Sequence, residues 1–455
     1  MSVRICLFTR DLRLTDNPVL HAASAAGREE VLPVFVNDPA VRAAGFAAPN
    51  RLAFLHDSLA DLDAGLRACG SRLVVRTGRT ADAVARLVGE TGASEVHLAA
   101  DHSAFAHARE EAVRAAAEPL GARVVAHEAV VTAVAPGAAV PTGSDHYAVF
   151  TPYLRRWSRT ALRRPLPPPQ NLRTPAKPHS EPLPTRPDAD QLSPSLAPGG
   201  ETEARRAMRS WLDHHLDGYD DGHDALADDR TSRLSPALHF GCLSPTELVH
   251  HARTAGTPGA AAFERQLAWR DFHHQVLAAR PDAARGDYRS RHDQWRDSPA
   301  ELRAWQQGRT GYPLVDAGMR QLRQEGWMHN RARLVTASFL CKTLGIDWRE
   351  GARHFLSLLV DGDIANNQLN WQWVAGTGTD TRPNRVLNPV AQAKRYDADG
   401  TYIRRWVPEL SALTAPAVHE PWKLPAALRA ELGYPEPLVA LDAGRDRFLS
   451  GRGRG

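Results

Sequence analysis

The sequence predicts two fold classes in one chain: an α/β N-terminal domain with a doubly wound, five-stranded parallel sheet, and an all-α C-terminal domain. Three observations lead to this prediction. Short β-rich apolar runs alternate with amphipathic stretches over residues 1–130. A Pro-rich stretch follows, and after residue 201 helical periodicity dominates. Ten of the eleven tryptophans lie in that last part, which indicates aromatic surfaces beyond the needs of a core.

The strands are expected at the apolar runs of the first 130 residues, namely Val3–Thr9, Val31–Val36, Arg72–Arg76, Glu95–Ala99 and Ala122–His127. Amphipathic helices are expected between them, for example at Arg51–Cys69 and Ala104–Glu118. Ligands of such sheets bind at the carboxyl ends of the strands. No glycine-rich dinucleotide motif or P-loop follows the first strand, so a standard nucleotide site is not indicated there.

Residues 131–200 are expected to connect the two domains, because Arg163–Gly200 is too rich in proline for a helix or a central strand. The helical domain is expected over residues 201–435. Ser244–Glu247 has the pattern of a helix start. Apolar spacing predicts helices at Ala261–Ala279, Leu314–Gln324, His329–Leu344 and Asp347–Leu358. Residues 436–455 are expected to be a tail, with disorder at Ser450–Gly455.

Composition limits the class of protein. The 455 residues are enough for about two or three domains. No run of about 18 apolar residues and no signal peptide is visible, so we expect a cytoplasmic protein without a membrane span. Lys occurs at only four positions, so Arg supplies nearly all the positive charge of a chain with net charge +4. Arg favours phosphate contacts and hence a nucleic-acid partner, although a GC-rich genome explains the same bias equally well.

Metal sites are not expected. The four cysteines are scattered and contain no C-x-x-C pair, which argues against zinc or an iron–sulfur cluster and fits a reducing cytosol. His214, His215 and His223 cluster near several Asp residues, but adjacent residues on a helix diverge by about 100°. A shared metal ion at these histidines is therefore not predicted.

The segment Asp361–Trp373 is the most informative part of the chain. It combines two carboxylates, three Asn, two Gln and two Trp in thirteen residues. A solvated loop has little use for two tryptophans, and an apolar core has little use for so many amides and acids. The mixture predicts a site for a large, flat, polar ligand.

Three further motifs carry clustered polar groups. Gln266, Trp269 and Arg270 share one face of a predicted helix, for which an exposed polar face is the alternative. The run Gly326–Leu334 leads polar residues straight into an apolar helix. The run Thr231–Gly241 places hydroxyls at a helix start, where they form either an anion cradle or an ordinary cap.

These motifs, together with Leu7–Pro18 at the N-terminus, resemble the DNA photolyase and cryptochrome family, most closely its class I cyclobutane pyrimidine dimer photolyases. The resemblance covers nearly the whole chain, from Phe8 to Trp422. It implies a two-domain fold with an antenna chromophore in the first domain and FAD in the second. Leu7 stands where the family usually has Trp.

The resemblance assigns the FAD contacts residue by residue. Asn367 is expected beside the flavin N5, where it tunes the cofactor. The full set of expected FAD contacts is Tyr219, Thr231, Ser232, Arg233, Leu234, Ser235, Trp269, Arg270, Asn330, Arg333, Asp361, Gly362, Asp363, Asn367 and Trp371.

The resemblance also implies a light-driven activity. A cyclobutane dimer in DNA is flipped out, stacks between Trp269 and Trp373 with Gln266 at its edge, and is split by an electron from excited, reduced FAD. The chain Trp371, Trp348 and Trp295 is expected to carry electrons from the surface to an oxidised flavin. No net redox change results from repair.

Two lesion-pocket positions depart from the best-known dimer repair enzymes, which carry Glu at the position of Gln266 and Met at that of Leu334. Gln still offers a donor and an acceptor, and Leu is an apolar wall of similar volume. The absence of a long C-terminal tail favours repair over signalling. The alternatives are a blue-light cryptochrome receptor without repair and a plain electron-transfer flavoprotein.

The antenna prediction rests on one departure from the family. Folate-type members carry an Asn-Glu pair after the fourth strand, and Asp101–Arg109 lacks it. An 8-hydroxy-5-deazaflavin antenna is therefore expected rather than methenyltetrahydrofolate, with Asp101 and Arg51 as contacts. The expected partner is damaged DNA, and a monomer without an obligate protein partner is expected.

Overall fold

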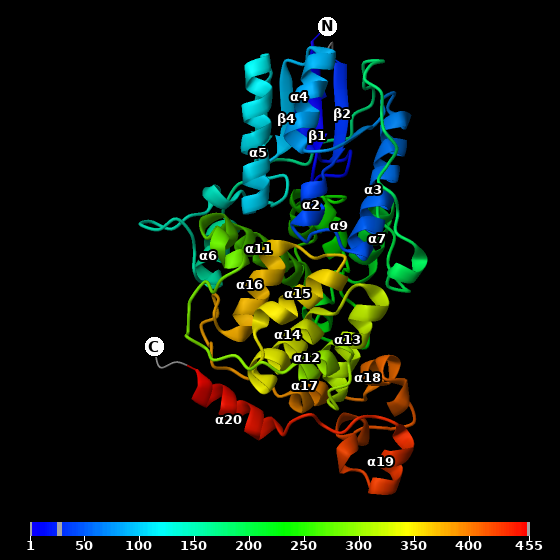
Figure 1. Ribbon diagram of the computed structural model, residues 1–455, viewed down its shortest axis with the longest axis vertical. Coiled ribbons are helices and arrows are strands. Elements are labelled where there is room, and N and C mark those ends of the chain that lie inside the picture. Colours follow the sequence, from blue (N-terminus) through cyan, green and yellow to red (C-terminus); the bar gives the residue numbers. More distant parts are fainter. Residues whose placement is uncertain (1, 25–29, 453–455) are drawn as a thin grey trace. The chain divides into compact units, whose positions relative to one another are not determined.

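The computed structural model describes residues 2–24 and 30–452 (Figure 1). They belong to two compact units, each of which is described by itself. Unit 1 lies within residues 1–191, 197–217 and 232–281, and unit 2 within residues 192–196, 218–231 and 282–455. These units are defined by compactness, whereas the expected domain boundaries rest on the change in sequence character near residue 200. The boundaries expected from the sequence therefore remain a prediction.

Unit 1 contains a five-stranded parallel sheet, which confirms the predicted fold class. Its strands are β1 Val3–Phe8, β2 Glu30–Asn37, β3 Val74–Thr77, β4 Glu95–Ala99 and β5 Arg123–His127. They lie in the order β3-β2-β1-β4-β5, and every neighbouring pair is parallel. The order reverses at β1, so the topological switch point lies between β1 and β4.

Helices cover both faces of this sheet. The right-handed rule for parallel crossovers assigns α1 and α3 to one face and α4 and α5 to the other, because the chain moves from β1 to β3 in one direction across the sheet and from β3 to β5 in the opposite direction. The pair α4 and α5 lies side by side in Figure 1, and α1 packs on β1 and β4. The helices of unit 1 are α1 Pro18–Ser24, α2 Pro39–Ala43, α3 Pro49–Ala68, α4 Thr80–Thr91, α5 Ala104–Ala117, α6 Phe150–Trp157, α7 Glu201–His214, α9 Ser235–Phe240, α10 Pro245–Ala255 and α11 Pro258–Ala279.

Unit 1 joins its sheet to helices that come much later in the chain. Arg13, which is only 1% exposed, donates to the carbonyl of Gly241 at 2.9 Å and to that of Asp16 at 3.1 Å. Gly241 has a φ of +71°, and a Cβ there would lie 2.0 Å from the carbonyl oxygen of Arg10. A side chain at residue 241 would therefore force the backbone after β1 away from the end of α9.

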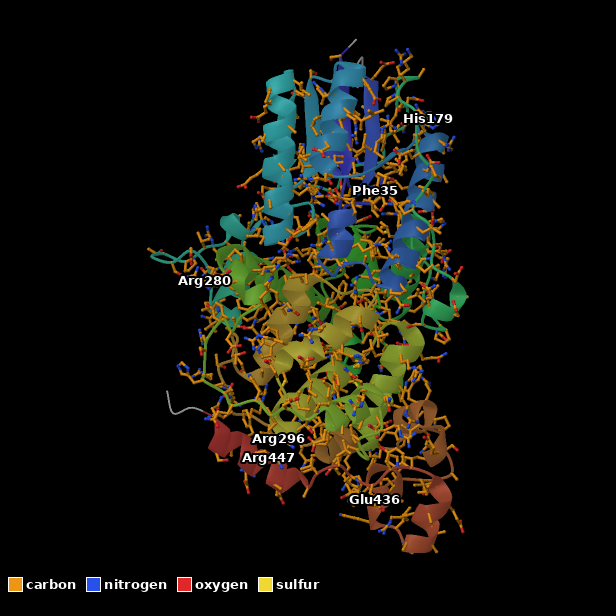
Figure 2. The ribbon with its side chains drawn as sticks, viewed as in Figure 1. Phe35, His179, Arg280, Arg296, Glu436 and Arg447 are labelled. Atoms are coloured by element: carbon orange, nitrogen blue, oxygen red, sulfur yellow. The ribbon has the colours of Figure 1, made fainter. Side chains whose placement is uncertain are left out.

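The Pro-rich stretch follows the edge of the sheet. The only regular structure within residues 163–200 is the 3-10 turn η3, Ala189–Gln191, as the composition predicts. Val75 of β3 donates its N–H to the Ser180 hydroxyl at 2.9 Å, and Glu181 donates back to the Val75 carbonyl at 3.0 Å. Arg76 donates to the carbonyl of His179, which is labelled in Figure 2. The stretch thus occupies polar groups of the edge strand β3 that could otherwise pair with another chain.

The regular structure of unit 2 is helical within its described residues, as the sequence predicts. Its helices are α8 Tyr219–Gly222, α12 Pro299–Gln306, α13 Pro313–Glu325, α14 Asn330–Ser338, α15 Trp348–Leu358, α16 Ile364–Ala375, α17 Pro389–Tyr396, α18 Thr401–Trp406, α19 Ala426–Leu432 and α20 Leu441–Gly451. A π-helical segment, Phe339–Leu344, continues α14. The apolar core includes Trp305, Trp348 and Trp371.

Local sequence signals set the helix ends. Ser244 caps α10 as predicted, because its Oγ accepts from the Glu247 N–H at 3.3 Å. The prediction of disorder is wrong for Ser450–Arg452: α20 extends to Gly451, and Arg452 is ion-paired with Asp293 at 3.1 Å. The remainder of that prediction, residues 453–455, lies outside the described residues. None of the described helices is long and apolar enough to cross a membrane.

Candidate functional site

The predicted site residues fall into two sets, one in each unit. Unit 1 holds Arg51, Asp101, Ser232, Arg233, Leu234, Ser235, Gln266, Trp269 and Arg270. Unit 2 holds Tyr219, Thr231, Trp295, Asn330, Arg333, Leu334, Trp348, Asp361, Gly362, Asp363, Asn367, Trp371 and Trp373. Within each set, the structure brings distant segments of the chain together.

In unit 1, an aromatic ring that the sequence analysis missed is stacked on one face of Trp269. Phe150 of α6 lies parallel to the indole, with ring centroids 3.7 Å apart and planes 8° apart. Phe272 packs edge-on against the indole at 5.5 Å. Trp269 and Gln266 remain partly exposed on the same face of α11. Phe150 therefore fixes the plane of the indole and covers one of its faces.

Arg270 ties α11 to two other segments of unit 1. One guanidinium nitrogen donates to the Val131 carbonyl at 2.5 Å and the other to the Leu238 carbonyl of α9 at 3.3 Å. These contacts hold α9, which starts directly after the predicted phosphate motif, at a fixed distance from α11.

Asp271 is a second residue that the sequence analysis missed. One carboxylate oxygen accepts from the backbone N–H groups of Ala133 and Val134, each at 3.0 Å, and from the Trp157 indole at 2.9 Å. Burial raises its pKa to about 6, against the opposing effects of Arg270 and these donors. An acid at a buried position of an amphipathic helix is the signal that could have revealed it.

The motif Thr231–Ser235 has the local geometry of a turn into a helix. Arg233 adopts a left-handed φ of +51°, and the Ser232 hydroxyl accepts from the Leu234 N–H at 3.4 Å. Among the described residues, the buried Thr231 hydroxyl has no hydrogen-bond partner. An unpartnered buried hydroxyl is rare, because its burial is costly. This donor set fits the phosphates or ribityl hydroxyls of a flavin dinucleotide.

In unit 2, an ion pair joins two of the predicted motifs. Arg333 of α14 donates to the Asp361 carboxylate at 2.8 Å and to the Met328 carbonyl at 2.8 Å. Asp363 caps α16 by accepting from the Asn366 N–H at 2.8 Å. Asp361 and Asp363 are 8% and 5% exposed. The sequence placed these residues in separate motifs, and the structure brings them together.

The amide of Asn367 is held in one orientation. Its nitrogen donates to the Ala352 carbonyl at 3.2 Å and to the Gln368 side-chain oxygen at 2.8 Å. One turn further along α16, Trp371 packs against α15, where a Cβ on Gly351 would come within 2.2 Å of the indole. Gly351 is therefore required for this close approach of the two helices.

The three tryptophans of the predicted relay all pack in one core of unit 2. Trp371 and Trp348 are 2% and 0% exposed, whereas Trp295 is only partly buried. The Trp348 indole donates to Asp287 at 2.9 Å. Trp305, which the sequence analysis did not single out, meets Trp371 edge-on with centroids 6.0 Å apart.

The remaining predicted contacts of unit 2 lie at different depths. Tyr219 is buried, with its ring 5.3 Å from that of His223. Asn330 is exposed at the start of α14, and Leu334 is half-buried one turn later. Trp373 is half-buried, and the guanidinium of Arg385 lies 4.9 Å from its ring centroid.

The predicted antenna contacts lie after the carboxyl ends of the strands of unit 1. Asp101, just beyond β4, pairs with Arg10, just beyond β1, at 3.2 Å. Burial opposes ionisation of Asp101, but the positive charges of Arg10 and of more distant groups hold its pKa well below the usual range. Arg51 of α3 donates to the Phe46 carbonyl at 2.8 Å. The Phe46 ring in turn meets Phe105 of α5 at 5.8 Å. Both predicted contacts thus lie at the edge where such sheets bind ligands.

No group of three or more His, Cys, Asp or Glu side chains among residues 2–24 and 30–452 is arranged to hold a metal ion.

The fold and these motifs are those of a flavoprotein, and comparisons with known proteins agree. The family described as the FAD binding domain of DNA photolyase matches residues 263–452, and the family described as DNA photolyase matches residues 4–171. The chain belongs to the DNA photolyase family and carries its FAD-binding domain. It is 61% identical, over the full length of both chains, to the deoxyribodipyrimidine photo-lyase of Streptomyces griseus.

Solved structures share the whole fold. A bacterial class III photolyase from Agrobacterium tumefaciens is 35% identical, with a TM-score of 0.91 over 99% of this chain and 96% of its own. A Synechocystis cryptochrome is 29% identical, with a TM-score of 0.90 over 99% of both chains.

Proposed function

We propose that this protein is a light-driven deoxyribodipyrimidine photo-lyase that splits cyclobutane pyrimidine dimers in DNA. The full-length identity of 61% to the Streptomyces griseus photo-lyase carries the proposal. The stacking of Phe150 on Trp269 supports it, because a partly exposed indole with one face already covered is suited to receive a base on the other.

FAD would be held by residues of several motifs. The Arg333–Asp361 pair offers a cation and a carboxylate to its polar edge, and Asp363 fixes the start of α16. The Thr231 hydroxyl and the turn at Ser232 and Arg233 suit its phosphates. Bound FAD supplies the light-absorbing electron donor, whereas the protein supplies position and polarity.

The chain's own residues prepare the dimer. Arg-rich surface attracts the DNA phosphates, with an affinity that falls as salt rises. A dimer is extruded at lower cost than an intact base, because its stacking is already impaired. Trp269 and Trp373 provide apolar faces for the extruded bases, Leu334 adds an apolar wall, and Gln266 can donate and accept at the base edge.

Trp371, Trp348 and Trp295 form the proposed electron relay. Trp295 is the least buried of the three, which suits a path that begins near solvent. The relay serves to bring the protein into its reduced form and takes no part in splitting the dimer.

The antenna proposed for unit 1 is an 8-hydroxy-5-deazaflavin held near Asp101 and Arg51. An ionised Asp101 and two neighbouring arginines, Arg10 and Arg109, favour a polar, hydrogen-bonding chromophore. Protein purified from a host that makes deazaflavins should carry a second chromophore absorbing near the visible–violet boundary, and protein from a host without them should not. Bound folate in either preparation contradicts this proposal.

We further propose a cytoplasmic monomer whose partner is damaged DNA. All four cysteines are free thiols, which suits a reducing compartment. We propose that residues 1–130 bind the antenna and that residues 201–435 bind FAD.

The test uses photoreduced protein and an oligonucleotide with one cyclobutane thymine dimer, in light and in darkness. Restoration of intact thymines in light alone is the expected result. A bound, photoreducible flavin without repair favours the second candidate, a cryptochrome-type receptor. The fold that this chain shares with the Synechocystis cryptochrome is the reason for considering it. Flavin chemistry independent of light favours an electron-transfer flavoprotein.

A further inference from the structure

The loop between α16 and α17, residues 376–388, is held from the inside by two buried cations. Lys342 of the π-helical segment donates to the carbonyls of Pro383 and Arg385, both at 2.8 Å. Arg452 donates to the same Pro383 carbonyl at 2.6 Å and to the Asn384 side chain at 3.0 Å. The carbonyls of the loop therefore point toward positive charge, and hydrogen bonds to charged donors are stronger than neutral ones.

Both cations are enclosed by the C-terminal helix. Lys342 is 1% exposed, and the side chain of Arg452 is 7% exposed. The Phe448 ring of α20 lies 5.3 Å from the Lys342 ammonium and 5.0 Å from the Arg452 guanidinium. α20 lies directly on the π-helical segment, since a Cβ on Gly444 would be 2.7 Å from the Thr343 carbonyl. A buried charge persists only where such partners offset its desolvation.

Arg452 also fixes the end of α16. It donates to the Ala375 carbonyl at 3.0 Å and pairs with Asp293 at 3.1 Å. Gly376, with a φ of +85°, leaves room for this guanidinium: a Cβ there would lie 2.7 Å from one of its nitrogens. The arginine thus joins the last turn of α16, which carries Trp373, to the tip of the following loop.

What this loop presents outward is Arg385. Its guanidinium lies over the Trp373 ring, 4.9 Å from the centroid, while its own carbonyl accepts from Lys342. The buried cations therefore hold the loop backbone from within the unit. The same loop places the Arg385 guanidinium over one face of Trp373. A cation over an indole is attracted by the negative face of the ring, so the contact favours one plane of Trp373.

We infer that Lys342 and Arg452 are positioning residues for the lesion site: they hold the 376–388 loop so that Arg385 covers one face of Trp373 and sets the plane of the indole for the extruded dimer. This inference rests on the proposed function. It assigns a role to the C-terminal end of the chain, and it explains why Lys stands at position 342 in a chain that otherwise relies on Arg. A narrow ammonium reaches two carbonyls in a space closed by Phe448, whereas a guanidinium is wider and planar.

The experiment compares Arg452→Gln with Arg447→Gln. Both residues lie at the C-terminal end of the chain and each change removes one positive charge, but Arg447 is exposed on α20 (Figure 2). Binding of a dimer-containing oligonucleotide and of the same undamaged oligonucleotide is measured, together with flavin content and the splitting yield of the fully bound complex. For Arg452→Gln we expect affinity for the dimer to fall about tenfold. Affinity for undamaged DNA, flavin content and the splitting yield should change less than twofold. Arg447→Gln should leave the preference for the dimer unchanged.

A second readout follows the loop itself. Amide hydrogen exchange of residues 376–388 should accelerate in Arg452→Gln and not in Arg447→Gln, and Arg452→Lys should restore part of the protection. If Arg452→Gln does not fold, Asp293→Asn, which removes only the partner carboxylate, takes its place with the same expectations. Unchanged dimer preference, or an equal loss for both DNAs, overturns the inference while leaving the proposed function intact. An unaltered protein that neither prefers nor repairs dimers overturns the proposed function and the inference with it.

Discussion

Phe150 and Trp269 lie face to face, 3.7 Å apart and nearly parallel, although one belongs to α6 and the other to α11. A face-to-face pair holds the plane of the indole more firmly than an edge contact, because neither ring can tilt without losing contact with the other. The covered face is no longer available to a ligand, so any base that stacks on Trp269 must do so from the other side.

Replacing Phe150 should weaken dimer binding. Phe150→Leu removes the ring that fixes the indole, so the dimer must order Trp269 on binding at a cost of about 0.5–1.5 kcal/mol, and the Kd for a dimer-containing oligonucleotide should rise by about 2- to 10-fold. Phe150→Tyr keeps the stack and should bind as the unaltered protein does. Equal binding by the Leu and Tyr variants would show that the stack has no role in recognition.

The identity of residue 266 should set how well the dimer is split. Gln266→Leu removes the donor and the acceptor, and dimer affinity should fall by about fivefold, the value of one ordinary hydrogen bond. A protonated Glu in Gln266→Glu is a stronger hydrogen-bond donor than an amide toward the dimer that has gained an electron, so the splitting yield per absorbed photon should rise. Repair of a defined dimer under counted photons measures both effects, and a lower yield in the Glu variant would contradict the second.

The Arg333–Asp361 pair should govern flavin retention. Asp361→Asn breaks the 2.8 Å ion pair and should lower FAD content after purification at least several-fold, because the half-buried Arg333 guanidinium that loses its partner turns toward other acceptors. The matched control is Asp224→Asn, which breaks the pair with Arg331 on the same helix α14. The ratio of flavin to protein absorbance distinguishes them, and equal loss in the two variants would indicate general destabilisation of α14.

The tryptophan relay should be separable from repair. Trp348→Phe should slow photoreduction of oxidised flavin by at least tenfold, while protein reduced chemically beforehand should repair dimers at an unchanged rate. Trp305→Phe is the control: Trp305 contacts Trp371 but is fully buried, and its indole donates to the Thr336 carbonyl at 3.0 Å. If Trp305→Phe slows photoreduction as much as Trp348→Phe does, the electron path differs from the one proposed.

His354 should make the fold sensitive to acid. Burial lowers its pKa to about 4, and among the described residues its Nε2 has no hydrogen-bond partner. The folded state therefore binds fewer protons than the unfolded state below pH 6.5, so its stability is present above that pH and is lost as the pH falls toward 4. The loss should reach about 2 kcal/mol at pH 5.

Urea unfolding of the unaltered protein and of His354→Phe, each at pH 7.5 and pH 5, measures this contribution. The difference between the two pH values should shrink by about 2 kcal/mol in the variant. An identical pH dependence in both proteins would mean that His354 becomes protonated without cost.

Much of the fold could be predicted, because it depends on local pattern. Glu95–Ala99 was predicted as a strand with the same bounds that the structure shows. The third strand begins two residues later than predicted. The Leu73 N–H donates to the Asp63 carboxylate at 2.8 Å and not to a neighbouring strand, so the strand starts only at Val74. Periodicity predicts the strand, whereas a side chain of the preceding helix α3 determines where the strand begins.

The site was predictable only as a set of motifs. Sequence pattern indicated that Arg333 and Asp361 have chemical roles, but not that they form an ion pair. The sequence did not predict three residues of the site, because each acts through a contact with a residue remote in the chain. They are Phe150, Asp271 and Arg452. An isolated aromatic, an acid within a helix, and an arginine in a Gly-rich end carry no local signal of those contacts.

The route of the chain through unit 1 has a consequence for its synthesis. Arg13 emerges from the ribosome early, yet the Gly241 carbonyl that accepts from it at 2.9 Å is translated more than two hundred residues later. Until α9 to α11 have been made, the nascent sheet therefore lacks one hydrogen-bond acceptor of the buried Arg13 guanidinium. Residues 218–231, which belong to unit 2, are translated within this interval. Unit 1 therefore cannot be completed until part of unit 2 has been translated, and its last helices are made while unit 2 still lacks residues 282–455.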